Sequence, residues 1–229
     1  AIINNQNSKI MNQQSTLEII RSLRLTGMAN HLEAVLDMPI HQQPEPEILL
    51  TQLLEAEQMY RNHRRMLTAV KIARFRYQAN LHDVICSPER NLTREQLARF
   101  ADCSFIDRGE NIIISGATGC GKSYLACAIG YQACSKGKKV VYFSLPKLLS
   151  KLKSDKLDGR FRKEMDRIEN KNLLILDDWG LAPLDTAARL ALLQMIEDRH
   201  NRYATIITSQ LPVAAWHQYI NESTIADAI

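Results

Sequence analysis

The chain has 229 residues, of which 45% are hydrophobic and 24% are charged, a composition that is typical of a globular protein and excludes fibrous and wholly disordered classes. The formal net charge of +4 is too small to indicate a partner by itself. No segment approaches the roughly 20 apolar residues needed to cross a bilayer, and the N-terminus lacks a signal-peptide pattern, so we expect a cytoplasmic protein with no membrane partner.

The first part of the chain is predicted to be helical. Residues 1–14 have the composition of a flexible tail or an expression remnant, and a capping box at Ser15–Glu18 indicates a first helix directly after them. A proline-bearing loop at residues 38–46 precedes a second, longer helix, and a capping box at residues 93–96 opens a shorter one. We therefore expect a small all-helical N-terminal domain over residues 15–90.

The pattern changes in the second half of the chain, where short apolar runs alternate with helical segments. Nearly continuous apolar runs are typical of parallel strands covered on both faces, and the segments between them are long enough for crossover helices. The sequence therefore predicts an α/β fold over residues 91–229, a parallel sheet flanked by helices. The expected strands are Ile112–Ser115, Val140–Ser144, Leu173–Asp177 and Thr205–Thr208.

Residues 116–123, GATGCGKS, match the phosphate-loop pattern GxxxxGK[ST] in full, between a predicted strand and a predicted helix. Glycines allow backbone N–H groups to face the phosphates, and the helix N-terminus adds positive charge. The alternative is a glycine-rich turn without a ligand. We expect Lys122 to reach the β and γ phosphates and Ser123 to bind Mg²⁺. The expected nucleotide-binding residues are Gly116, Ala117, Thr118, Gly119, Cys120, Gly121, Lys122, Ser123 and Tyr124.

Two adjacent acids, Asp177 and Asp178, follow an apolar run, as a nucleotide triphosphatase requires. We assign Asp177 to Mg²⁺. Asp178 stands where a catalytic Glu is usual and is one methylene shorter, so we expect binding to be more robust than hydrolysis. Ser209 and Gln210 end the last predicted strand and are further candidates to reach the γ-phosphate or its attacking water. The alternative for each pair is an ordinary polar turn after a strand.

The pattern of cysteines and histidines argues against a metal site with thiolate or imidazole ligands. Five cysteines without a CxxC pair fit neither a disulfide framework nor a thiolate zinc site, and six histidines form no HExxH or HxxxH pattern. Any bound ion is therefore expected to have oxygen ligands.

Positive charge is concentrated between residues 61 and 76, where no acid interrupts six basic side chains. On a helix, five of them, Arg61, Arg64, Arg65, Lys71 and Arg76, fall within an arc of roughly 140°. Such a face suits the phosphates of double-stranded DNA, and a solvated helix face is the alternative. The expected DNA contacts are these five and Arg74, with Lys151, Lys153, Arg160 and Arg162 from a mixed-charge stretch as secondary contacts.

The helical part with its arginines, the segments GATGCGKS and LLILDDWG, and the stretch TIITSQLP together resemble the IstB-like ATP-binding proteins, relatives of the DnaC helicase loaders among the AAA+ ATPases. The resemblance covers roughly residues 15–229. It implies an AAA+ fold, an ATP-dependent homo-oligomer assembled on double-stranded DNA, and service to the transposase of an insertion sequence. It places the first sensor at Ser209 or Gln210, where most AAA+ proteins carry Asn or Thr. The trans-acting arginine and second sensor would lie beyond Ile229.

Three rival functions remain open at this stage. A DnaC-like helicase loader would share the ATPase core but act on a hexameric helicase. A small-molecule kinase would need an acceptor pocket and a lid with arginines, and we find no clear candidate for either. A non-hydrolysing, nucleotide-gated DNA scaffold would not depend on Asp178.

Overall fold

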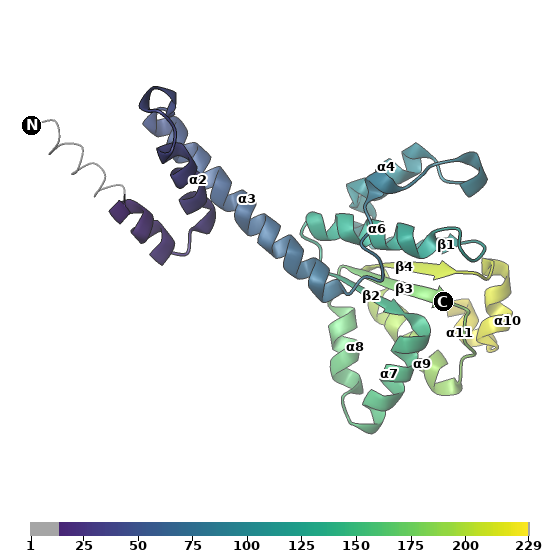
Figure 1. Ribbon diagram of the computed structural model, residues 1–229. Helices are drawn as coiled ribbons and strands as arrows, with labels where there is room; N and C mark the ends of the chain where they lie inside the picture. Colours follow the sequence, from purple (N-terminus) through teal and green to yellow (C-terminus); the bar gives the residue numbers. More distant parts are fainter. Residues whose placement is uncertain (1–13, 229) are drawn as a thin grey trace, which may run out of the picture. The chain divides into compact units, whose positions relative to one another are not determined.

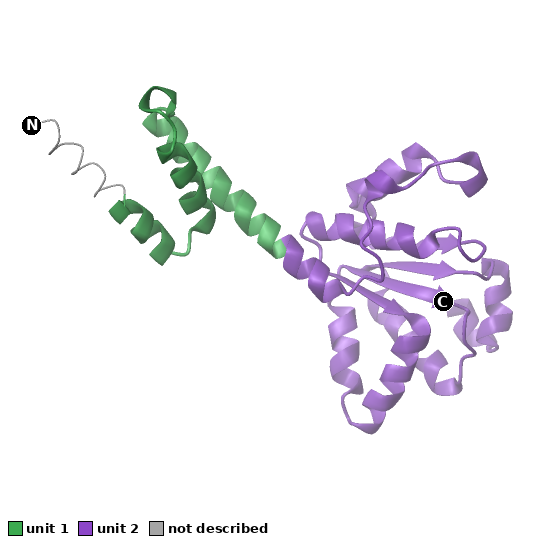
Figure 2. Cartoon of the chain, viewed as in Figure 1, with its two compact units in different colours: residues 1–65 green, residues 66–229 purple. Residues whose placement is uncertain are grey.

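The computed structural model describes residues 14–228, so the expected N-terminal tail, except for its last residue, lies outside the described residues. The chain divides into two compact units, residues 1–65 and residues 66–229 (Figure 2).

The first unit is helical, as predicted. Residues 14–22 form a helix, followed by α2 (Thr26–Leu36), a 3₁₀ turn (Ile40–Gln42) and the beginning of α3 (Pro46–Ala73). The buried carboxylate of Glu57 on α3 accepts the N–H groups of Gly27 (2.7 Å) and Met28 (3.2 Å), which satisfies the first turn of α2. A Cβ on Gly27 would lie 2.5 Å from the carbonyl oxygen of Ala56, so only glycine allows this approach of the two helices.

The boundary between the units falls within α3, whereas the sequence analysis expected the helical domain to continue to residue 90. The difference has a packing cause. Ala73, Ala79 and Leu81 are buried in the core of the second unit. The ring of Phe75 fills the space that a Cβ on Gly130 would need, at 2.5 Å. Apolar burial therefore joins residues 66–90 to the second unit.

The second unit contains a four-stranded parallel sheet in the order β1-β4-β3-β2, which confirms the predicted fold class (Figure 1). The strands are β1 (Ile112–Ser115), β2 (Val140–Ser144), β3 (Leu173–Trp179) and β4 (Ala204–Ser209). Ser115 pairs with Ser209, and Ser144 pairs with Asp177. Because all strands run in one direction, these polar residues meet at the carboxyl edge of the sheet.

Helices cover both faces of the sheet (Figure 1). One face carries α6 (Lys122–Ser135), with α4 (Arg94–Asp102) and α5 (Ser104–Asp107) nearby; the capping box predicted at Thr93 and Gln96 is confirmed at the start of α4. The other face carries α7 (Leu145–Leu157), α8 (Phe161–Glu169) and α9 (Thr186–Arg199). The remaining elements are 3₁₀ turns at Leu81–Asp83, Pro88–Arg90 and Val213–Ala215, and helices α10 (Trp216–Ile220) and α11 (Ser223–Ala228).

A buried arginine fixes the beginnings of the two central strands. The guanidinium of Arg199 donates to the carbonyl oxygens of Ile168 (2.9 Å), Lys171 (2.9 Å) and Ala204 (2.6 Å). Burial lowers the pKa of Arg199 to about 10. Since β3 begins at Leu173 and β4 at Ala204, these contacts hold the beginnings of both strands in place. Among the described helices, none is long and apolar enough to cross a membrane.

Candidate functional site

The glycine-rich loop joins β1 to α6 at the carboxyl edge of the sheet. Gly119 (φ 81°) and Gly121 (φ 90°) are left-handed, and a Cβ on either would meet nothing within 4 Å. Backbone conformation, and not crowding, therefore requires glycine at both positions. The loop leads directly into α6, whose first N–H groups have no intrahelical partners. Lys122 donates to the carbonyl oxygen of Ala117 (2.7 Å).

Asp177 is fully buried at the end of β3 and accepts three hydroxyl groups. Ser123 donates from α6 (2.7 Å), Tyr142 from β2 (2.5 Å), and Thr208 from β4. Burial alone would raise the pKa of Asp177, but these hydrogen bonds and the charge of Arg76 outweigh it and hold the pKa below its usual range. The ionised carboxylate therefore lies in contact with the hydroxyl of Ser123, the other residue assigned to the metal from the sequence.

Asp178 points in a different direction from its neighbour. Its backbone is left-handed (φ 63°), and the pairing of β3 with β4 is irregular between Leu176 and Trp179. The carboxylate accepts the hydroxyl of Ser144 (3.2 Å) and is 21% exposed. A left-handed non-glycine residue costs free energy and is frequent at functional sites. This kink turns the second acid out of the sheet while the first stays buried.

A cavity of about 520 Å³ brings most of the predicted phosphate-site residues together. Asp178 and Gln210 face it from the ends of β3 and β4. Ser209 also borders it, but its hydroxyl donates to the carbonyl oxygen of Trp179 (3.1 Å) and accepts the N–H of Leu211 (3.0 Å). The geometry thus leaves Gln210, and not Ser209, with a side chain available to a ligand. The loop residues lining this cavity are Thr118, Gly119, Gly121, Lys122, Ser123 and Tyr124.

A second cavity, also about 520 Å³, lies beside the loop and was not expected from the sequence. It is bordered by β1, by the start of α6 and by residues 83–92. Cys120, Tyr124 and Leu125 line it together with Val84 and Ile85. This mixed, largely apolar lining suits a flat ring better than a phosphate chain.

Four residues that contact the strand-end acids were missed as site residues: Thr208, Tyr142, Ser144 and Arg76. Thr208 and Tyr142 hold Asp177 as described above. Arg76 was predicted as a DNA contact on the basic helix face, but α3 ends at Ala73 and Arg74 is left-handed (φ 57°), so Arg76 leaves that face. Its Nη1 lies 3.4 Å from Asp178 Oδ2 and 3.6 Å from Asp177 Oδ2. Thr208 could have been suspected from its place at the end of a strand, whereas Arg76 had no such indication.

The predicted DNA contacts of the first unit lie together around one shallow cavity of about 430 Å³. Arg61 pairs with Glu57 (2.7 Å), and Arg64 contacts the ring and hydroxyl of Tyr60. The cavity is also lined by Arg65 and by Arg24, which the sequence analysis did not single out. Within residues 14–228, neither Arg24 nor Arg65 has an ion-pair partner.

The remaining predicted basic contacts lie in the second unit. Lys71 and Arg74 are exposed. Of the secondary set, Lys151 pairs with Glu164 (2.7 Å), Lys153 with Asp185 (3.4 Å) and Arg160 with Asp158 (2.5 Å), while Arg162 is exposed. Paired charges attract a phosphate chain less than unpaired ones, so this set is the weaker of the two.

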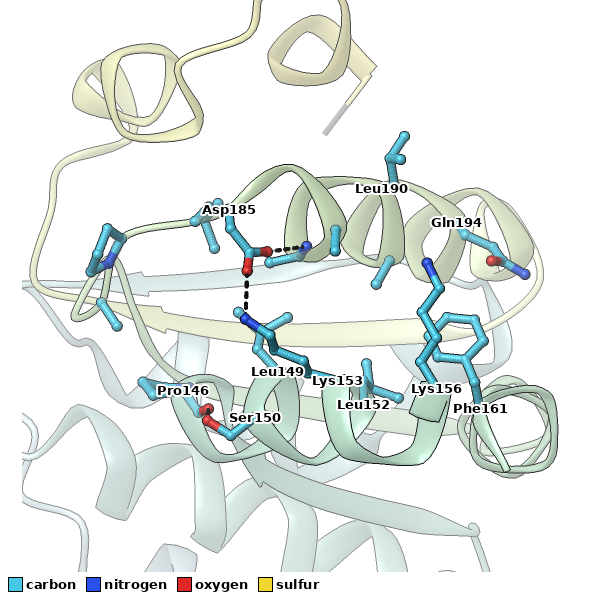
Figure 3. A pocket seen from close by; sticks show the side chains of 16 residues that line it. Pro146, Leu149, Ser150, Leu152, Lys153, Lys156, Phe161, Asp185, Leu190 and Gln194 are labelled. Atoms are coloured by element: carbon cyan, nitrogen blue, oxygen red, sulfur yellow. Dashed lines mark hydrogen bonds and ion pairs between the residues drawn. The ribbon is translucent and has the colours of Figure 1, made fainter. Parts of the chain in front are cut away.

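A further cavity of about 650 Å³ lies between α7 and α9, away from the glycine-rich loop (Figure 3). Leu149, Leu152 and Phe161 contribute to its apolar lining, and the Lys153–Asp185 pair crosses one end. It brings together none of the residues assigned to phosphate or metal.

Together, the parallel sheet, the phosphate loop and the buried strand-end acid define a P-loop nucleotide triphosphatase fold of the AAA+ type. The chain belongs to the family of IstB-like ATP binding proteins, whose sequence profile matches residues 18–229. This confirms the resemblance noted from the sequence. An insertion sequence ATP-binding protein, y4pL, of Sinorhizobium fredii is 40% identical over 93% of this chain and 87% of its own length. The ATP-binding protein of insertion sequence IS1162 from Pseudomonas fluorescens is 37% identical over 88% of each chain.

Solved structures share the fold at low sequence identity. The DnaC helicase loader matches with a TM-score of 0.56 and 22% identity, over 66% of this chain and 92% of that one. AMPPCP-bound DnaA from Aquifex aeolicus matches with a TM-score of 0.54 and 20% identity, over 62% of this chain and 44% of that one.

The hydroxyl of Thr208 should stabilise the fold by bonding the Asp177 carboxylate. We predict that Thr208→Val lowers the free energy of unfolding by roughly 1.5–3 kcal/mol at neutral pH, because a charge-assisted hydrogen bond is lost. The pKa of Asp177 is depressed in the folded state, so this loss is fully present at neutral pH and shrinks as the pH falls toward the pKa of the folded-state carboxylate.

Urea denaturation from neutral to acid pH measures this effect. Thr51→Val, at an exposed position on α3, serves as the matched control and should be nearly neutral. A deficit for Thr208→Val that stays constant over the whole pH range would contradict a bond to an ionised carboxylate.

Proposed function

We propose that this protein is an ATP-dependent, DNA-binding oligomeric ATPase that assists transposition of an insertion sequence. In this proposal it assembles on double-stranded target DNA and recruits or activates the transposase. The observation that carries the nucleotide part is the hydrogen bond between Ser123, the last residue of the phosphate loop, and the buried carboxylate of Asp177. Relatives named as insertion sequence ATP-binding proteins support the transposition part.

The residues of the site fit Mg²⁺ and ATP. Ser123 and Asp177 offer oxygen ligands, and Mg²⁺ is commonly held by one or two protein oxygens together with substrate phosphates. When bound, Mg²⁺ neutralises phosphate charge. Lys122 would hold the β and γ phosphates, and the loop N–H groups would line the phosphate chain. The cavity beside Val84 and Ile85 is the proposed place of the adenine base.

We assign hydrolysis to residues of the cavity that is lined by the glycine-rich loop, Asp178 and Gln210, called the phosphate-side cavity below. Asp178 and Gln210 would orient the attacking water, with the hydroxyl of Ser144 holding the Asp178 carboxylate (3.2 Å). Ser209 would act indirectly, because its hydroxyl holds the backbone on either side of Gln210. Because the Asp178 side chain is one methylene shorter than the usual Glu, we expect ATP hydrolysis to be slow.

DNA binding is assigned first to the arginine-lined cavity of the first unit. We propose that Arg61, Arg64 and Arg65, together with Arg24, contact phosphates of the duplex. A guanidinium group can donate two parallel hydrogen bonds to the oxygens of one phosphate. Additional contacts are proposed for Lys71 and Arg74, and secondary ones for Lys151, Lys153, Arg160 and Arg162. Phosphate contacts carry little sequence information, so target preference should be weak.

The alternative function is a DnaC-like helicase loader, which the shared fold with the DnaC structure favours. The same nucleotide site would serve both functions. Co-purification with a hexameric helicase, in place of a transposase, would decide for the loader.

The central test of this proposal is the mass of the protein on a plain DNA duplex, measured by light scattering with ATP, with ADP and without nucleotide. We predict an oligomer on DNA that requires ATP and that Lys122→Ala cannot form, because its phosphate contact is lost. Lys136→Ala, an exposed lysine outside the site, is the control and should assemble normally. A monomer indifferent to DNA under all conditions would overturn the proposal and favour the small-molecule kinase.

The proposed arginine contacts predict the salt dependence of DNA binding. Arg65→Gln and Arg24→Asn should each weaken binding to all duplex sequences. Each should also make the fall of log affinity with log salt concentration shallower, by about 0.9 per subunit. Asn tolerates the left-handed backbone of Arg24 (φ 59°). Arg21→Gln is the matched control, since Arg21 pairs with Glu33 outside this cavity. Slopes equal to that of the native protein would remove these arginines from the interface.

A further inference from the structure

Arg76 is placed among the residues of the phosphate-side cavity. Its guanidinium faces Asp178 (3.4 Å) and Asp177 (3.6 Å), and the side chain remains 48% exposed. The pKa of Arg76 is raised by neighbouring Tyr77 and by the charge of Asp178, so the group stays fully charged. An exposed, positively charged guanidinium group therefore lines the same cavity as the glycine-rich loop.

Neighbouring contacts fix the position of this arginine. Phe75 packs against Gly130 of α6, and the Tyr77 ring lies against the Tyr124 ring at 6.4 Å. The Arg76 guanidinium also lies over the Tyr77 ring, 5.5 Å from its centroid. Because the residues on both sides of Arg76 pack on α6, its side chain is directed toward the cavity and not into solvent on the helix face predicted from the sequence.

The charged residues that line the cavity favour an anionic ligand near Arg76. Among the described residues that line it, Lys122 and Arg76 are basic and Asp178 is acidic. Lys122 belongs to the glycine-rich loop, whereas Arg76 stands beside the acid at the end of β3. A terminal phosphate between these two cations would be contacted from both sides, and the planar guanidinium can donate two parallel bonds to its oxygens.

We propose that Arg76 binds the terminal phosphate of ATP, exchanging its ion pair with Asp178 for the γ-phosphate oxygens. The inference rests on the proposed nucleotide site. Arg76 then distinguishes ATP from ADP, because only the triphosphate carries the group it contacts. Its release of Asp178 leaves that carboxylate free to orient water when ATP is bound.

The test compares the binding of two ligands, AMPPCP and ADP, by calorimetry in the presence of Mg²⁺. It uses the native protein and the variants Arg76→Gln, Arg76→Lys and Arg99→Gln. Arg76→Gln should weaken AMPPCP binding by about tenfold or more and ADP binding by less than about threefold, since a charge-assisted contact is lost for one ligand alone. Arg76→Lys should recover part of the AMPPCP affinity. Arg99→Gln, at an exposed arginine of α4 outside the cavity, should bind both ligands normally.

The possible failures are distinguishable. If the native protein binds both ligands and Arg76→Gln loses equal affinity for both, or for neither, Arg76 does not contact the terminal phosphate. If the native protein binds neither ligand, the proposed nucleotide site itself is overturned. Retained ADP binding by Arg76→Gln serves as the check that this variant is folded.

Discussion

The carboxylate of Asp177 is the point on which the second unit depends most. It is completely buried, yet charged, because hydroxyl groups from α6, β2 and β4 all donate to it. A buried charge is costly unless it is hydrogen-bonded, so each of these three donors contributes to the stability of the fold. The same group ties the phosphate-loop helix to the two strands beside β3. Structural stability and the proposed metal site therefore rely on one set of contacts.

Backbone geometry then separates the roles of the two adjacent acids. An ordinary strand would send Asp177 and Asp178 to opposite faces of the sheet, both covered by helices. The left-handed backbone of Asp178 and the irregular pairing after Leu176 end the regular strand, so the second carboxylate emerges at the edge and faces the cavity. Strain at this residue is thus the means by which one acid stays structural and the other becomes available to a ligand.

The parts of the structure that depend on local sequence could be predicted. The four strands were found because each is a short apolar run, and the phosphate loop because its glycines and lysine are contiguous. The contacts of Thr208, Tyr142 and Arg76 with the acids could not be found in this way, since they depend on strand order and register. Arg76 was placed on a helix face because no residue near it marks the end of α3 in the sequence. The left-handed residue that follows the helix is Arg74, where glycine would have been the usual indication.

The central claim is that Ser123 and Asp177 together hold the ion that accompanies ATP. The most direct measurement is the affinity for ATP as a function of Mg²⁺ concentration in the native protein, in Asp177→Asn and in Ser123→Ala. We predict that Mg²⁺ strengthens ATP binding to the native protein, and that both variants bind ATP without this enhancement. An undiminished Mg²⁺ enhancement in both variants would contradict the account.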